Sequence, residues 1–329
     1  MIMRRTLLIA LGAIALSTPL ATPAQQPEKM TRIGILVAGS LEQRGDLDRA
    51  LTEGLRKQGY IEGKNLLIER RYANGISAQL PEFARTLADM KLDAIVTTCT
   101  PSTRAAKQAT SSTPIVMAAV SDPVAQNLIA SLARPGQNIT GLSSQADEVL
   151  PKRLELLASV LPPQTVIAVL ANSRNAIHPP MWQKLQGAAQ QLNLKLVLVE
   201  ADGAMGLPAA FDAAVRAHAR ALFVLPDDPM TFNARARVVE FAAKNRMPDF
   251  YWASEFVEAG GLLSYGENLR NSYVNAATYV DKVVKGANPA TLPVAQPTRF
   301  ELVINQKSAK SLGLTIPPSI LVQADRVIE

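Results

Sequence analysis

Short strand-like runs alternate with helical segments along nearly the whole chain, and this alternation restricts the possible folds more than any other feature of the sequence. Five runs stand in the first half, at 31–37, 65–72, 93–98, 113–120 and 138–143, and five in the second, at 165–171, 194–200, 219–225, 247–253 and 260–266. Between them, apolar residues recur at helical spacing, as at Leu47, Leu51 and Leu55. Strands that alternate with helices build parallel sheets covered by helices.

The runs of the first half recur in the same order in the second half, at an offset of about 125–135 residues. We therefore predict an α/β protein of two similar doubly wound parallel-sheet lobes joined by a hinge, with a cleft between them. Polar crossovers place lobe one at 25–144 plus about 268–298, and lobe two at 145–267. The segment 299–329 fits either lobe.

The first residues have the pattern of an export signal. Arg4 and Arg5 precede an unbroken apolar stretch, and small residues then make a cleavage site near Ala24. We predict that 1–24 is a cleaved signal peptide and that the mature protein is periplasmic. The chain's one cysteine, Cys99, lies far from the cleavage site and has no internal disulfide partner. We therefore expect no lipid anchor, and we interpret Cys99 as a small buried residue.

Charge and motifs argue against nucleic-acid binding and against catalysis. Removal of 1–24 takes away two arginines, so Lys+Arg falls from 34 to 32 against 28 Asp+Glu, and the net charge falls from +6 to +4. The chain has no nucleophile-elbow, dinucleotide-binding or P-loop motif. Two isolated histidines and one cysteine do not make a zinc site. We predict a binding protein rather than an enzyme, without metal or cofactor.

Polar residues at the carboxyl ends of the strands are the candidates for ligand contact, because open α/β sheets bind ligands there. Three of them precede proline, at Thr100, Asp122 and Asp228, which predicts an N-cap followed by the first residue of a helix. Asp122 is interpreted first as a helix cap, and direct ligand contact is the alternative. Free amides in the first turn of such helices favour a carboxylate.

The full set of candidate ligand-binding residues follows the strand ends of both lobes. They are Gly39, Ser40, Thr98, Thr100, Ser102, Ser121 and Asp122 in lobe one, and Asn172, Ser173, Arg174, Asp227, Ser254, Glu255 and Tyr265 in lobe two. Each also has a purely structural interpretation as a cap, a tight loop, a solvated charge or core packing. From the helix starts and the acidic residues of lobe two we expect a small solute that is amino-acid-like or otherwise carries a carboxylate.

Several sequence segments together resemble the ABC-transporter substrate-binding proteins of the tryptophan/tyrosine-type family. The segments are IGIL (33–36), GLRKQGYIEGKNLLIERRYANG (54–75), TPIVMAAVSDPV (113–124), LARPGQNITGLS (132–143) and FELVINQKSAKSLGLTIP (300–317). The resemblance implies the type I periplasmic binding protein fold, with two lobes that close on a small solute. It also implies delivery of that solute to an ABC permease by a monomer that meets the membrane only through the permease.

Other functions fit parts of the same pattern. A periplasmic sensor that reports ligand occupancy to a membrane receptor would have the same sequence features. A two-lobed transferase should carry a nucleotide-phosphate loop, and none is present. A repressor of this fold would need an N-terminal helix-turn-helix where this chain has a predicted signal peptide.

Overall fold

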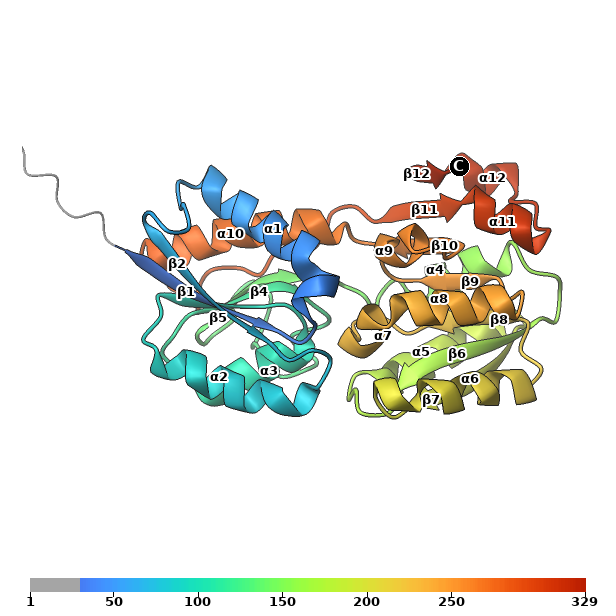
Figure 1. Cartoon of the computed structure of the whole chain (residues 1–329), viewed down its shortest axis with the longest axis horizontal. Coiled ribbons are helices and arrows are strands. Elements are labelled where there is room, and N and C mark those ends of the chain that lie inside the picture. Colours follow the sequence, from blue (N-terminus) through green and yellow to red (C-terminus); the bar gives the residue numbers. More distant parts are fainter. Residues whose placement is uncertain (1–29) are drawn as a thin grey trace, which may run out of the picture.

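The computed structural model describes residues 30–329, so the predicted signal peptide at 1–24 lies outside the described residues. Two lobes lie side by side, each with a central sheet and helices on both faces (Figure 1). This arrangement confirms the predicted pair of α/β lobes. Within residues 30–329, no helix is both long and apolar enough to cross a membrane.

Lobe one is built on a five-stranded parallel sheet in the order β2-β1-β3-β4-β5. Its strands are β1 (Thr31–Val37), β2 (Leu66–Tyr72), β3 (Ala94–Thr97), β4 (Ile115–Val120) and β5 (Ile139–Ser143). One face packs against α1 (Leu41–Lys57) and α10 (Leu269–Val284), the other against α2 (Leu80–Asp89) and α3 (Thr100–Ala109) (Figure 1). Because helices cover both faces, every residue of β4 is buried, which explains its continuous apolar sequence.

Lobe two repeats this plan and extends it. Its strands are β6 (Val166–Asn172), β7 (Lys195–Ala201), β8 (Ala221–Val224), β9 (Asp249–Tyr251), β10 (Leu263–Gly266), β11 (Glu301–Asn305) and β12 (Arg326–Ile328). The sheet order is β12-β11-β10-β9-β8-β6-β7, so the first five strands have the same relative order as those of lobe one. Only the pairing of β10 with β11 is antiparallel among the described strands of this sheet.

The helices of lobe two likewise cover both faces of its sheet. They are α4 (Leu150–Ala158), α5 (His178–Gln191), α6 (Leu207–Arg216), α7 (Pro229–Asn233), α8 (Arg235–Lys244), α9 (Ser254–Glu258), α11 (Gln306–Leu312) and α12 (Pro318–Leu321). Short 3-10 turns follow the second strand of each lobe, η1 (Ser77–Gln79) after β2 and η2 (Ala204–Gly206) after β7. The sequence did not decide which lobe holds the segment 299–329. In the structure this segment contributes β11 and β12 to the sheet of lobe two.

The chain passes between the lobes after β5, after β10 and before β11, and the second passage returns α10 to lobe one (Figure 1). There α10 packs closely on α1. A Cβ on Gly54 would lie only 2.6 Å from the carbonyl oxygen of Val274, so glycine is what allows this approach. The Tyr60 hydroxyl donates to Asp281 Oδ1 at 3.0 Å and joins the same two regions.

The helix that the sequence predicts after Pro123 does not form, and residues 123–127 make a turn that bends at 128–130 continue. Asp122 and Asn127 have φ of 33° and 54°, and these left-handed values interrupt any helical run. The Asp122 carboxylate still acts as a cap, because its Oδ1 accepts from Ala125 N at 3.0 Å. It therefore caps a turn rather than a helix.

Candidate ligand-binding site

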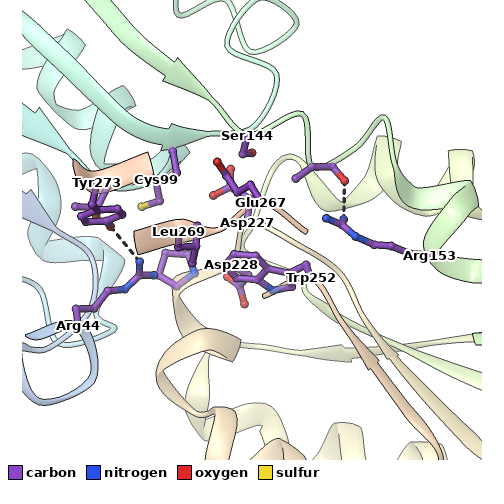
Figure 2. A pocket seen from close by; sticks show the side chains of 14 residues that line it. Arg44, Cys99, Ser144, Arg153, Asp227, Asp228, Trp252, Glu267, Leu269 and Tyr273 are labelled. Atoms are coloured by element: carbon purple, nitrogen blue, oxygen red, sulfur yellow. Dashed lines mark hydrogen bonds between the residues drawn. The ribbon is translucent and has the colours of Figure 1, made fainter. Parts of the chain in front are cut away.

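A narrow cavity lies between the two lobes, next to the crossovers (Figure 2). The space between its lining atoms, including the part open to solvent, measures about 460 Å³. Its polar and aromatic lining residues are Thr98, Ser144, Arg44, Arg153, Asp227, Asp228, Glu267, Trp252 and Tyr273. The cavity thus combines both signs of charge with aromatic surface.

Arg44 supplies one positive charge to the cavity from the apolar face of α1. Its side chain is buried, and Nη1 donates to the Tyr273 hydroxyl at 3.4 Å. The guanidinium also lies over the ring of Phe232 from lobe two, 4.2 Å from the ring centroid. Arg44 therefore belongs to lobe one but contacts both lobes.

Arg153 supplies a second positive charge from α4, where it shares the buried face with Leu154 and Leu157. Its Nε donates to the Tyr265 carbonyl and its Nη1 to the Ala146 carbonyl, both at 2.7 Å. Burial lowers the pKa of this guanidinium below its usual range. The two carbonyl contacts fix its position beside the crossover, and Figure 2 shows one of them as a dashed line.

Three carboxyl groups line the same cavity as these arginines. Asp228 is the N-cap of α7 and accepts from Thr231 N at 3.0 Å, as the sequence predicted for a polar residue before proline. Glu267 accepts from the Ser272 hydroxyl at 2.5 Å, and burial raises its pKa to about 7. Burial likewise raises the pKa of Asp227 to about 6. Burial therefore shifts both carboxyl groups toward their protonated form.

Three buried polar atoms that belong to cavity-lining residues have no hydrogen-bond partner among residues 30–329. They are Arg44 Nε, Ser144 Oγ and Trp252 Nε1. A buried polar group without a partner costs about 1–3 kcal/mol. A solute that forms hydrogen bonds with these three atoms removes that cost, so they mark a candidate binding site. All three can donate a proton, which suits a solute rich in acceptor oxygens.

Aromatic side chains support the wall that Trp252 forms. The Phe232 ring centroid lies 5.6 Å from that of Trp252, and the Phe256 centroid lies 6.1 Å from it. Edge and tilted contacts of this kind hold an aromatic ring in place at little entropic cost. The indole is therefore a preformed surface for an apolar or aromatic part of a solute.

The lobes touch directly beside the cavity. The Thr100 hydroxyl donates to Asp227 Oδ2 at 2.5 Å, and Ser121 N donates to the same oxygen at 3.2 Å. Farther along, the Asn233 side chain of lobe two lies against Gly39 and Gly75 of lobe one. These contacts describe a closed arrangement of the lobes.

The structure brings only part of the predicted site to the cavity. Thr98 and Asp227 line it, and Gly39, Thr100 and Ser121 take part in the contact between the lobes. Cys99 also lines it, and burial raises the pKa of its thiol to about 11, in line with a small buried residue.

The other predicted residues of lobe one have structural partners. Ser40 is the N-cap of α1 and accepts from Gln43 N at 3.3 Å. Ser102 was expected to donate to a ligand, but its hydroxyl donates to the Cys99 carbonyl and accepts from Thr98 N and Cys99 N. The capping box of α3 therefore uses this hydroxyl completely. Asp122 lies outside the cavity.

In lobe two, six predicted residues lie away from the cavity. Arg174 is exposed and pairs with Asp202; Ser173 is exposed beside Ala201. Asn172 is buried and donates to Asp228 Oδ1. Ser254 and Glu255 line a separate groove, and Tyr265 packs against Phe300 with ring centroids 5.7 Å apart.

Sequence reasoning missed most of the charged residues of the cavity, namely Arg44, Arg153 and Glu267. A signal for two of them existed. Arg44 falls on the same helical face as Leu47 and Leu51, and Arg153 falls on the face of Leu154 and Leu157. A charged residue in an apolar stripe is buried with the stripe and needs a special environment.

The fold and the interlobe cavity define a two-lobed solute-binding protein of the type I periplasmic binding protein fold. The sequence pattern of the ABC transporter substrate binding protein family matches residues 33–328, and the chain belongs to this family.

Known proteins of this family resemble this chain over most of their length. A tyrosine-binding protein of Clostridioides difficile is 26% identical over 292 residues, which cover 87% of this chain and 82% of that protein. The crystal structure of an ABC domain from Streptococcus pneumonia in complex with L-Trp is 26% identical, with a TM-score of 0.83 over 91% of this chain and 99% of that one.

A ligand-free, open structure of a substrate-binding protein with adhesive properties from Clostridium difficile is less similar in shape. It is 25% identical and covers the same 91% of this chain and 99% of that one, yet its TM-score is 0.63. The lobes of this chain are therefore arranged more as in the L-Trp complex than as in the open protein.

Proposed function

We propose that this protein captures an amino acid between its lobes and delivers it to the permease of an ABC importer. L-tyrosine and L-tryptophan are the first candidates. The observation that carries the proposal is the set of unpartnered buried donors in a cavity with both signs of charge. A zwitterion brings acceptor oxygens and an ammonium group, and it can satisfy both kinds of group at once.

The cavity residues divide naturally between the parts of such a solute. Arg44 Nε and Ser144 Oγ are donors for its carboxylate, and the charged arginine makes the stronger bond of the two. Glu267 and Asp227 are acceptors for its ammonium group. The indole of Trp252 offers a face or an N–H to the side chain.

The relatives support the aromatic class of solute. One is described as tyrosine-binding and another was solved with L-Trp. The family and the predicted signal peptide support delivery to a permease and export to the periplasm, and we propose that the protein acts as a monomer. Uptake of radiolabelled L-tyrosine or L-tryptophan by cells with and without the gene tests delivery, because a pure sensor leaves uptake unchanged.

Calorimetry of the purified protein with matched analogues tests the binding mode. We expect L-tyrosine or L-tryptophan to bind, and tyramine and tryptamine, which lack the carboxylate, to bind much more weakly. A solute at 100 times its Kd should stabilise the protein by about 2.7 kcal/mol in thermal unfolding. Arg174→Ala should leave this preference for the amino acids over the amines unchanged, because this exposed arginine lies outside the cavity. Equal affinity for the amines, or preference for a neutral sugar, would overturn the zwitterion assignment.

A further inference from the structure

His178, the first residue of α5, is almost completely buried and does not line the cavity. Its Nδ1 accepts from Asn172 N at 2.9 Å, and its Nε2 lies 3.1 Å from the Pro226 carbonyl oxygen. Because a carbonyl only accepts, Nε2 must carry the proton, and because Nδ1 accepts, the ring must be neutral. Burial lowers the pKa of His178 and favours this neutral form.

The carbonyl that His178 holds begins the loop 226–228, which follows β8 and carries Asp227. Asp227 has φ of 53°, a left-handed value that costs energy for any residue other than glycine. Such a backbone persists only where its surroundings hold it. The side chains around it do so, since Asn175 Nδ2 donates to the Asp227 carbonyl and Asn172 Nδ2 donates to Asp228 Oδ1, both at 2.9 Å.

The same loop makes the polar contact between the lobes. Asp227 Oδ2 accepts from the Thr100 hydroxyl and from Ser121 N. Away from the crossovers, every hydrogen bond between the lobes that the described residues make ends on this oxygen. The reach of Asp227 across the cleft therefore depends on a strained backbone conformation that residues of the β6–α5 turn maintain.

We propose that His178 is a positioning residue for lobe closure: its neutral ring fixes the Pro226 carbonyl and so holds Asp227 where its carboxylate reaches Thr100 and Ser121. The inference rests on the proposed function in one respect, since capture of a solute requires closure. It makes His178 a determinant of solute affinity, although this residue does not line the cavity.

A double-mutant cycle with His178→Phe and Asp227→Ala tests the proposal, because phenylalanine has a ring of similar shape but cannot donate to the Pro226 carbonyl. His218→Phe is the control, because His218 is the chain's other histidine and is exposed. The measurements are the Kd for L-tryptophan and the amide hydrogen exchange of Ser121, with and without L-tryptophan. We expect His178→Phe to weaken binding and Ser121 protection each by about tenfold, as for a lost buried hydrogen bond. In the Asp227→Ala background, His178→Phe should change either quantity less than about twofold.

Ser121 belongs to lobe one, so a merely local defect in lobe two leaves its exchange unchanged. Additive effects in the double variant, or normal Ser121 protection in a folded His178→Phe protein, overturn the positioning role. Ring-nitrogen NMR gives a test that needs no solute, and a doubly protonated His178 at pH 7 also overturns the role. Lack of L-tryptophan and L-tyrosine binding by the unmodified protein counts against the proposed function alone, because Ser121 exchange and the ring tautomer still decide the role of His178.

Discussion

Substitution of Gly39 by alanine should block closure of the lobes, because the added methyl group has no room in the closed arrangement. An ideal Cβ at this position lies 2.6 Å from Asn233 Oδ1 and 2.9 Å from Arg44 Cγ. The backbone of Gly39 is not in the left-handed region, so alanine is not strained by itself. The contact with Arg44 lies within lobe one, but the clash with Asn233 arises only when lobe two approaches, so this part of the cost acts on the closed state.

Overpacking of this size costs about 1–3 kcal/mol. If that cost falls on the closed state alone, the Kd for the solute rises about 5- to 150-fold. Titration calorimetry with L-tryptophan measures this change directly. Asn233→Ala introduced into the Gly39→Ala protein should restore much of the affinity, since it removes the atom that the methyl group meets.

Gly45→Ala is the matched control, because it makes the same chemical change within α1. Its Cβ would lie 3.5 Å from Arg49 Nη1, which is an ordinary contact. We expect unchanged affinity and a free energy of unfolding higher by about 0.5–1 kcal/mol, from the better helix propensity of alanine. If Gly39→Ala binds the solute as tightly as the unmodified protein, the packing argument for closure is wrong.

Three further substitutions separate stability from binding. Burial raises the pKa of Asp249 to about 7, so this carboxyl binds an extra proton in the native state between about pH 4 and 7, and its contribution to stability is lost as the pH rises through this window. Asp249→Asn should reduce the slope of the free energy of unfolding against pH in urea unfolding, although Glu267 and Asp227 still contribute to it. An unchanged slope would refute the assignment. Ser102→Ala should lower the free energy of unfolding by about 1 kcal/mol through the lost cap of α3 and leave the Kd unchanged; a large loss of affinity at normal stability would return Ser102 to the ligand site. Trp252→Phe keeps the aromatic wall but removes a donor that lacks a partner in the described chain, so calorimetry should show affinity about 2- to 10-fold weaker with stability unchanged; equal affinity would mean that the solute does not accept from the indole.

The fold was predictable because parallel sheets covered on both faces leave a strong pattern. All ten strand-like runs form strands, and their repeated order reappears as the shared order of the two sheets. The antiparallel return of β11 was not predictable, since its apolar sequence suits either lobe. The missing helix after Pro123 shows the limit of turn chemistry: Asp-Pro marks a cap, but not whether a helix or a turn follows.

The site was less predictable, because a capping residue and a ligand-binding residue are the same amino acids at the same strand ends. Ser102 and Asp228 cap their helices, and nothing in sequence distinguishes them from Asp227, which reaches the other lobe. The cavity also takes Arg44 and Arg153 from helices rather than strand ends. Their place in an apolar helical stripe marks them as buried, but no local pattern shows that both stripes border the same cavity.

The return of α10 to lobe one determines when each lobe can finish folding while the chain is being synthesised. Tyr60, just beyond α1, and its partner Asp281 on α10 are 221 positions apart in the chain. At a synthesis rate of about 5–20 residues per second, roughly 11–44 s pass between their appearances. During that interval the apolar face of α1 lacks its covering helix. The lobe that is made first is therefore finished only after most of the other lobe has been made, and a chain that stops before α10 leaves lobe one unfinished.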